Sequence, residues 1–173
     1  MAIVIWLTGL PASGKTTIAH ALYNQLKCMG FLVCVLDGDI LRSGINSDLS
    51  LSKDDRKENI RRTAHIAKIV SDVGVITICS LISPYKDLRD HARFIIGNDF
   101  KEIFVKCPVA ECKKRDPKGL YAKQERGEIF GLTGVDAEYE EPLSPDLIIE
   151  TDKYDINYCV DSIIDLILKN LRA

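Results

Sequence analysis

The chain has 173 residues and a formal net charge of −2 at pH 7, with 46% hydrophobic and 28% charged residues. This length allows one domain with a substantial core and is too short for two ordinary domains. The small net charge argues against a general nucleic-acid or membrane-surface binder, and no apolar run approaches the ~20 residues that span a bilayer. The N-terminus lacks the basic segment of a signal peptide, so we expect a cytoplasmic protein.

Short β-branched runs alternate with longer runs of helical period along the chain. The first run, 3–9, predicts a strand, and 15–29 predicts a helix that ends at Gly30, a residue type that commonly terminates helices. The run 31–39 predicts a second strand that ends in carboxylates. Further elements are expected, in chain order, as a helix at 54–73, a strand at 75–80, a helix at 86–96, a strand at 102–107, a short helix at 109–115, a strand at 147–151 and a helix from 155 onward.

Apolar strands separated by helices predict an α/β fold, with a parallel sheet covered on both faces. Ligands of such sheets bind at the carboxyl ends of the strands, so the segments after the first three strands should share one rim. Residues 116–146 break the alternation, being rich in glycine, proline and charge. We expect this segment to be a mobile lid on a single domain that spans residues 1–173.

The cysteines and histidines do not form a metal-binding pattern. Cys107 and Cys112 are the only closely spaced pair of cysteines, and no second pair completes a zinc site. We expect all six cysteines to be buried free thiols. The three histidines fall within predicted helices and are assigned no chemistry; they are His20, His65 and His91.

The loop after the first strand matches G-x-x-x-x-G-K-[ST] in full, with Gly9, Gly14, Lys15 and Thr16 at the defining positions. Glycines allow backbone N–H groups to point at phosphate oxygens, and the helix that follows directs its positive end to the same place. A glycine-rich turn that binds nothing is the alternative. We expect ATP in this loop, with Mg²⁺ on Thr16, and contacts from Gly9, Leu10, Pro11, Ala12, Ser13, Gly14, Lys15, Thr16 and Thr17.

Three further groups lie on the expected acceptor side. Asp37 and Asp39 end the second strand, where one carboxylate can hold the metal and one can accept a proton from an attacking hydroxyl; an ordinary acidic turn is the alternative. The segment 54–62 can bind a second anion through its arginines, or can be a charged face paired with its own carboxylates. The segment 115–121 could place Arg115 and Lys118 over the phosphates.

Together these pieces resemble the adenylylsulfate kinase (APS kinase) family, a group of P-loop kinases. The matching pieces run in order from about Val4 to Thr151 and are GLPASGKTT, DGDILR, GINSDL, DRKENIRR, ISPY, RDPKGLY, GEIFGLTG and YEEP. The resemblance implies a five-stranded parallel sheet and a homodimer. It also implies transfer of the γ-phosphate of ATP to the ribose 3′-hydroxyl of adenosine 5′-phosphosulfate (APS).

Residue roles follow from the resemblance by position. Asp37 would be the base or metal-organising carboxylate, and Arg115 would lie beside ATP. Ser83 is associated in the family with a phosphoserine intermediate, but direct in-line transfer needs no covalent step, so we expect an acceptor contact there. The implied acceptor contacts are Asp39, Arg42, Leu51, Arg56, Asn59, Ile82, Ser83, Lys118, Leu132 and Thr133.

Two positions depart from the family pattern. Leu51 and Leu132 stand where the family usually has the phenylalanines associated with gripping the adenine. Stacking contributes on the order of 1–3 kcal/mol per base, so their loss could weaken adenine binding. Leucine can also form an adequate apolar slot, or the slot can suit another nucleotide such as cytidine diphosphoramidate. A non-catalytic nucleotide-binding regulator is the remaining alternative, and the intact Lys15, Thr16 and Asp37 argue against it.

Overall fold

In the computed structural model, which describes residues 3–172, five parallel strands form one sheet in the order β2-β3-β1-β4-β5. The strands are β1 (Val4–Thr8), β2 (Val33–Asp37), β3 (Ile76–Ser80), β4 (Phe100–Lys106) and β5 (Leu147–Glu150). The helices are α1 (Lys15–Cys28), α2 (Gly38–Ser43), α3 (Lys53–Asp72), α4 (Lys86–Ile96), α5 (Val109–Arg115), α6 (Leu120–Glu125) and α7 (Ile156–Arg172), with a short 3-10 turn η1 (Gly97–Asp99). The predicted α/β fold is confirmed.

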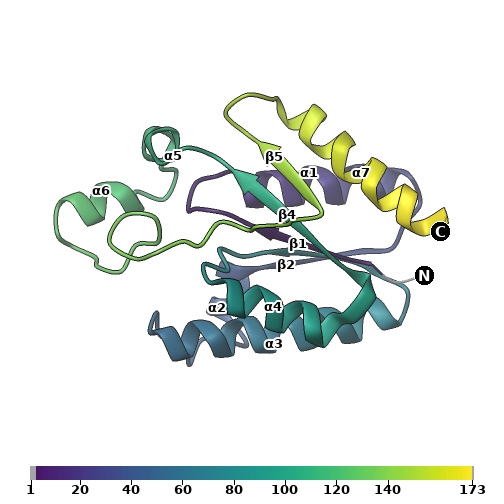
Figure 1. Ribbon diagram of the computed structural model, residues 1–173, viewed down its shortest axis with the longest axis horizontal. Helices are drawn as coiled ribbons and strands as arrows, with labels where there is room; N and C mark the ends of the chain where they lie inside the picture. The colour runs from purple at the N-terminus through teal and green to yellow at the C-terminus, as the bar shows by residue number, and fades with distance from the viewer. Residues whose placement is uncertain (1–2, 173) are drawn as a thin grey trace.

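Helices cover both faces of the sheet, as Figure 1 shows. Successive residues of β1 point to opposite faces, so Ile5 and Leu7 pack under α1 and α7 while Val4 and Trp6 pack against α3 and α4. Each residue from Val4 to Thr8 is buried. This two-sided burial explains why the strands read as continuous apolar runs rather than as alternating ones.

The strand order reverses at β1, which has β3 on one side and β4 on the other. The crevice at such a switch point is where open α/β sheets bind ligands. The register aligns the ends of neighbouring strands, because Ser80 of β3 pairs with both Leu7 of β1 and Asp37 of β2. The loops after β1, β2 and β3 therefore meet at one rim, as predicted.

Helix boundaries follow from local signals. The hydroxyl of Ser52 accepts a hydrogen bond from the backbone N–H of Asp55 at 3.1 Å and so caps the N-terminus of α3. Two negative residues, Asp54 and Asp55, lie in the first turn of α3, where the helix dipole favours them. None of the helices in residues 3–172 is long and apolar enough to cross a membrane.

Several predicted boundaries differ from the structure by one or two residues, and the helix α6 was missed. The second strand ends at Asp37 and not at residue 39, because the Asp37 carboxylate accepts from the backbone N–H of Asp39 and starts α2. The fourth strand begins at Phe100, two residues before its predicted start at residue 102. The segment 116–146 also contains a helix, α6, whose short length hid its period. Among the cysteines, Cys28 is exposed and Cys34 half-buried, whereas the other four are buried; all six are free thiols.

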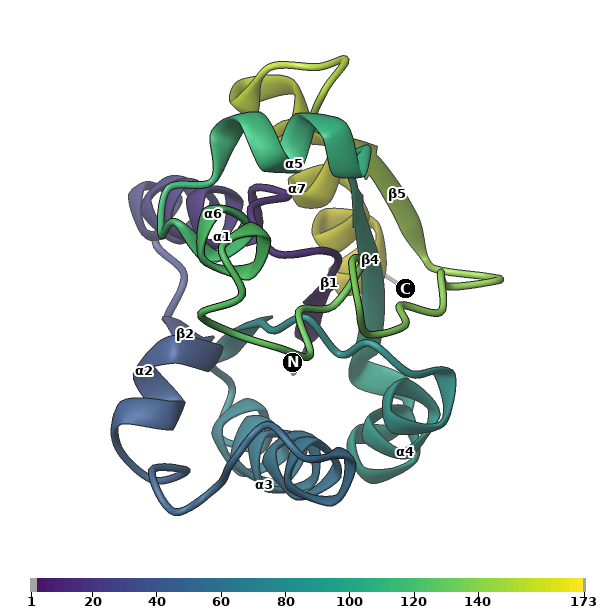
Figure 2. The ribbon, with the colours of Figure 1, turned by 90° about the vertical axis from the view of Figure 1, so that its left-hand side faces the viewer.

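The segment 116–146 projects from the carboxyl end of the sheet, as Figures 1 and 2 show. Its last part is fastened to the body: the Tyr139 hydroxyl lies 3.0 Å from the Thr8 hydroxyl, and the Glu140 backbone N–H donates to the Pro84 carbonyl at 2.8 Å. Phe104 stacks on the Tyr139 ring. The return arm of this segment is thus anchored beside β1 and β4.

Candidate active site

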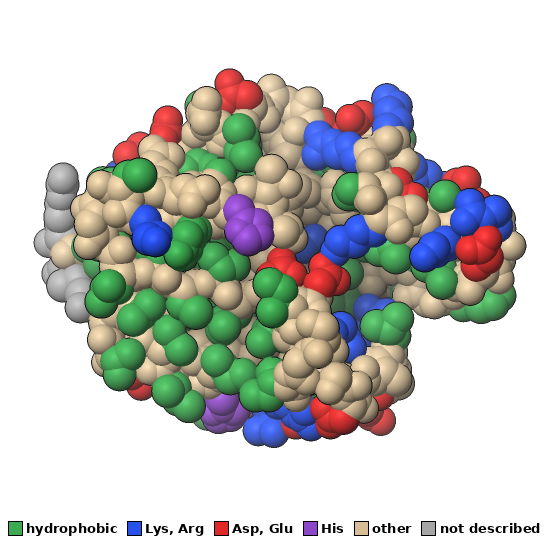
Figure 3. All heavy atoms as spheres, turned by 180° about the vertical axis from the view of Figure 1, so that it is seen from behind, with side chains coloured by type: hydrophobic (Ala, Val, Ile, Leu, Met, Phe, Trp, Pro, Cys, Tyr) green, Lys and Arg blue, Asp and Glu red, His purple; other side chains and the backbone are tan. Residues whose placement is uncertain are grey.

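A cavity of about 750 Å³ opens at the rim formed by β1, β2 and β3. One end is lined by Gly14, Lys15 and Thr16, and the other by Arg56 and Asn59. Further lining residues with expected roles are Pro11, Ala12, Thr17, Asp37, Asp39, Arg42, Leu51, Ile82, Ser83, Arg115 and Lys118. Figure 3 shows a hollow between the projecting segment and the body, with acidic and basic side chains along it. The cavity therefore joins the predicted phosphate loop to the predicted acceptor residues.

The phosphate loop is held tightly against the sheet. Gly9 has φ 155°, and a Cβ there would meet the Val105 carbonyl oxygen at 2.4 Å, so only glycine fits this position. Gly14 has φ 104° and forms the N-cap of α1, which places the positive end of that helix at the loop. These features make the loop an anion site formed by the backbone.

Lys15 is 8% exposed and lies inside this loop. Its ammonium donates to the carbonyl oxygens of Gly9 at 3.0 Å and Leu10 at 2.6 Å. Burial, with a smaller contribution from the nearby Lys118, lowers the pKa of Lys15 from 10.5 to about 8. The loop thus holds a desolvated cation at the place where an anion would restore its charge balance.

Asp37 connects the phosphate loop to the acceptor side. Its Oδ2 accepts a hydrogen bond from the Thr16 hydroxyl at 2.9 Å, and its Oδ1 accepts from the backbone N–H of Asp39 at 2.9 Å. Asp37 is buried, whereas Asp39 is exposed and pairs with Lys118 from the projecting segment. The two carboxylates therefore differ: Asp37 is fixed in the loop wall, and Asp39 contacts the lid.

Ser83 occupies a strained and fully supported position. Its φ is 45°, in the left-handed region, and the residue is 2% exposed. Its hydroxyl oxygen accepts from Trp6 Nε1 at 3.0 Å, and its carbonyl oxygen accepts from Arg89 at 2.8 Å. Thr8 donates to the neighbouring Ile82 carbonyl at 2.7 Å. This support fixes the backbone of the ISPY segment at the cavity wall.

Two basic residues at the cavity, Arg56 and Arg115, have different partners. Arg56 donates to the Thr133 hydroxyl and to the Gly131 carbonyl oxygen, both at 3.0 Å. Arg115 donates to the Thr151 hydroxyl at 3.1 Å and the Thr151 carbonyl oxygen at 2.8 Å, and so lies beside the end of β5. Arg56 therefore holds the lid in this conformation with donors that the resemblance assigns to the acceptor.

Leu51 and Leu132 differ in their surroundings. Leu51 lines the cavity and is 60% exposed, whereas Leu132 is 8% exposed and packs in a cluster with Cys107, Cys112 and Tyr121. Leu132 is not among the residues that line the cavity. The expectation that both leucines flank one base stays a prediction.

The charged face of α3 divides into two parts. Arg56 and Asn59 face the cavity. Arg61 and Arg62 instead pair with Glu58 at 2.7 and 2.8 Å, and Arg62 also pairs with Asp48 at 2.7 Å. These pairs hold the pKa of Glu58 at about 2 through hydrogen bonds from Arg61 and Arg62. The alternative of a charged surface therefore applies to this second part of the helix.

Sequence reasoning missed several residues that shape the site. Trp6 and Thr8 support the ISPY segment from β1, and Tyr154 and Asp155 line the cavity beyond β5. A single tryptophan inside a buried strand was an available clue, because a buried indole N–H needs an acceptor. The residues after β5 carried no comparable pattern.

Comparison with known proteins places the chain in a family. The family model described as adenylylsulphate kinase matches residues 1–150. The adenylyl-sulfate kinase of Clostridium acetobutylicum is 49% identical over 162 residues, which cover 94% of this chain and 81% of that protein. The solved APS kinase CysC of Mycobacterium tuberculosis, in complex with AMPPNP and APS, is similar with a TM-score of 0.93 and 41% identity, covering 96% of this chain and 97% of that one.

A hexameric APS kinase from Thiobacillus denitrificans is also similar, with a TM-score of 0.70 and 30% identity, covering 94% of this chain and 28% of that one. The family model covers most of the sequence, and the identity of the Clostridium protein extends over nearly all of it. The chain therefore belongs to the adenylylsulphate kinase family.

Proposed function

We propose that this protein is an ATP-dependent kinase that phosphorylates the ribose 3′-hydroxyl of APS to give 3′-phosphoadenosine 5′-phosphosulfate. One observation carries the proposal: a single cavity contains the phosphate loop with Lys15 and, within the same space, the acceptor set around Arg56, Asn59 and Ser83. Phosphoryl transfer depends on positioning and charge stabilisation, and a shared cavity provides both.

The phosphate loop supplies the ATP side of the reaction. Backbone N–H groups and the N-terminus of α1 bind phosphate oxygens, and Lys15 turns from the Gly9 and Leu10 carbonyls to the transferred phosphoryl group. Arg115, beside Thr151, lies where it can contact the nucleotide. These groups neutralise the charge that spreads over the phosphoryl oxygens during transfer.

Mg²⁺ fits the residues present. Thr16 Oγ1 and Asp37 Oδ2 lie 2.9 Å apart at the phosphate loop, and oxygen atoms are the ligands that Mg²⁺ prefers. Residues 3–172 contain no group of three His, Cys, Asp or Glu side chains arranged for a metal, so triphosphate oxygens and water would complete the shell. When bound, Mg²⁺ supplies charge neutralisation on the β- and γ-phosphates.

Asp37 is the proposed base. It is buried at the rim, and its carboxylate can accept the proton of the attacking hydroxyl while the Asp39 N–H keeps it oriented. The proposed acceptor contacts are the lining residues Asp39, Arg42, Leu51, Arg56, Asn59, Ile82, Ser83 and Lys118. Leu132 and Thr133 would join them only if the lid changes conformation.

Ser83 contacts the acceptor in this proposal and does not carry phosphate. The Ser83 hydroxyl is enclosed and accepts from the Trp6 indole, so a phosphoserine would displace that buried donor from its partner. Unpairing a buried indole N–H costs roughly 1–3 kcal/mol. Direct transfer between two bound substrates avoids this cost.

The lid would exclude water from the transfer. Lys118 pairs with Asp39 and Arg56 pairs with Thr133, so two contacts already connect the lid to the rim. Bound substrates compete for these same groups, and lid closure over them protects the phosphoryl group from hydrolysis. We also propose a cytoplasmic homodimer, in line with the family resemblance.

Acceptor-dependent ADP release tests the function. The purified protein is assayed with ATP and Mg²⁺ alone, with APS, and with cytidine nucleotides including cytidine diphosphoramidate. We expect ADP release on APS at least tenfold faster than on any cytidine compound. Equal or faster release on the cytidine compounds would favour the alternative acceptor, and no acceptor-dependent release at all would support the regulator.

A further inference from the structure

Asn46 is a fully buried polar residue that the reaction, as described above, does not use. It lies in the loop between α2 and α3, is 0% exposed, and its Oδ1 has no hydrogen-bond partner within the described residues. An unpaired buried carbonyl costs roughly 1–3 kcal/mol, so a residue that carries one needs a physical reason. The hydrogen bond made by the other polar atom of its amide, Nδ2, supplies that reason.

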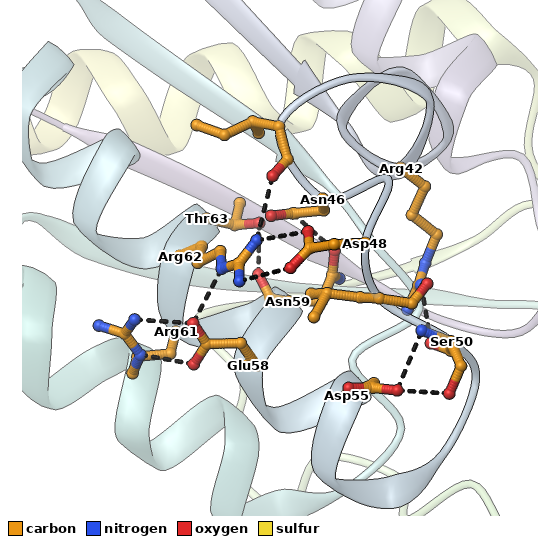
Figure 4. Close-up of polar contacts among 12 residues, drawn as sticks. Arg42, Asn46, Asp48, Ser50, Asp55, Glu58, Asn59, Arg61, Arg62 and Thr63 are labelled. Atoms are coloured by element: carbon orange, nitrogen blue, oxygen red, sulfur yellow. Dashed lines mark hydrogen bonds and ion pairs between the residues drawn. The ribbon is translucent and has the colours of Figure 1, made fainter.

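Asn46 Nδ2 donates a hydrogen bond to Asn59 Oδ1 at 2.8 Å, as Figure 4 shows. Asn59 lies on α3 and lines the cavity. Since its Oδ1 is engaged by Asn46, the amide of Asn59 has one orientation, with the Nδ2 group on the other side. No hydrogen bond within residues 3–172 engages that Nδ2, and it is not closed off from solvent, so it presents two N–H donors to the cavity.

The loop around Asn46 is fixed from both sides. The Asn46 backbone N–H donates to the Leu41 carbonyl at 2.8 Å, and its carbonyl accepts from Leu49 at 3.1 Å. Arg62 donates to the neighbouring Ile45 carbonyl at 3.1 Å and to the Asp48 carboxylate. These bonds fix the position of Asn46 beside α3, where its Nδ2 is directed at Asn59 Oδ1.

We propose that Asn46 is a positioning residue that fixes the amide orientation of Asn59, so that Asn59 offers hydrogen-bond donors rather than an acceptor to the second substrate. This inference rests on the proposed function, in which Asn59 contacts APS. The substrate carries phosphate and sulfate oxygens, for which N–H groups are partners and a carbonyl oxygen is not.

The test compares Asn46→Asp with a matched control, Thr63→Val. An aspartate at 46 has nearly the same shape but its carboxylate only accepts, so it draws Asn59 Nδ2 toward itself and turns Asn59 Oδ1 to the cavity. Thr63 donates to the Asn59 backbone carbonyl at 2.7 Å and is equally buried. Its loss removes a hydrogen bond from the same residue without affecting the amide.

The KM values for APS and for ATP are measured at saturating concentration of the other substrate, with thermal unfolding as the check on folding. We expect Asn46→Asp to raise the KM for APS roughly tenfold to a hundredfold, with the KM for ATP within twofold of the wild type. Thr63→Val should leave both KM values within twofold. Equal changes in the KM for APS in these two variants would overturn the positioning role.

A buried carboxylate can prevent folding, so Asn46→Leu provides a second variant of similar volume. It releases the Asn59 amide without reversing it, and we expect a smaller rise in the KM for APS, roughly threefold. An unchanged KM for APS in Asn46→Leu would overturn the positioning role of Asn46. The proposed function would still stand in that case, provided that the wild-type protein turns over APS. Wild-type protein without turnover on APS would overturn both.

Discussion

Lys15 makes a quantitative prediction about the binding of ATP at different pH. Burial lowers the pKa of its ammonium from 10.5 to about 8 in the protein without nucleotide. At about 1.4 kcal/mol per pKa unit, this corresponds to a cost of about 3 kcal/mol for holding the charge in the loop. Phosphate oxygens next to the ammonium favour the charged form, so ATP binding should raise the pKa of Lys15 again.

The direction of the pH effect follows from the difference between the pKa of Lys15 in the free protein and in the ATP complex. Well below pH 8 Lys15 is charged with and without ATP, and binding takes up almost no proton. Above pH 8 the free protein loses the proton and the complex keeps it, so binding requires proton uptake and becomes weaker. With a free-state pKa of about 8, we expect roughly eightfold weaker binding at pH 9 than at pH 7.5, with uptake of about 0.9 proton at pH 9.

Titration calorimetry with a non-hydrolysable ATP analogue and Mg²⁺ measures both quantities, using buffers that differ in ionisation enthalpy. Lys15→Arg is the control, because its guanidinium stays charged over this range. We expect weaker binding in that variant but no dependence on pH between 7.5 and 9. A flat profile in the wild-type protein, or the same slope in Lys15→Arg, would refute the reasoning.

Three further predictions concern the rim and the core. Arg89 is buried and pairs with Glu102 at 2.8 Å, so Glu102→Gln leaves Arg89 without its counter-charge. We expect this variant to lower the free energy of unfolding in urea by about 3–5 kcal/mol. A loss of less than about 1 kcal/mol would contradict this prediction. Leu51→Phe should lower the KM for APS about threefold or more, because the ring can stack on the adenine. Leu132→Phe should overpack its cluster and lower the free energy of unfolding by about 1–3 kcal/mol. A lower KM for APS in Leu132→Phe and not in Leu51→Phe would show that Leu132 contacts the base. Lys118→Met removes an exposed ion pair with Asp39 and should leave the unfolding temperature nearly unchanged. The same variant should lower kcat/KM for APS at least tenfold. An unchanged kcat/KM would exclude Lys118 from the site.

Features that depend on short stretches of sequence were predicted well. The apolar run of β1, the glycines of the loop and the helix from Lys15 occur in order within 25 residues, and each has a local physical cause. The meeting of Asp37 with the phosphate loop was also predictable, because parallel strands end at one edge. Pattern and topology together were sufficient for these residues.

Features that depend on packing between distant segments were not predicted. Trp6 and Ser83 are 77 positions apart, and Thr8 and Tyr139 are 131 apart, so no local pattern indicates either contact. Leu132 packs in the cluster around Tyr121, and its position in the sequence does not indicate that contact. Periodicity and motif spacing do not predict the contacts of side chains whose partners are set by the tertiary fold.

The most direct measurement follows the γ-phosphate of ATP through a single turnover. The protein, in excess over ATP labelled at the γ-phosphate, is mixed with APS and quenched at increasing times, and the label is located in nucleotide, inorganic phosphate and protein. If the two substrates meet in one cavity beside Asp37, the label should pass to the ribose 3′-oxygen of the acceptor in step with ADP formation, with none bound to protein. Label that appears first on Ser83 and then declines as product forms, or that is released as inorganic phosphate, would contradict direct transfer.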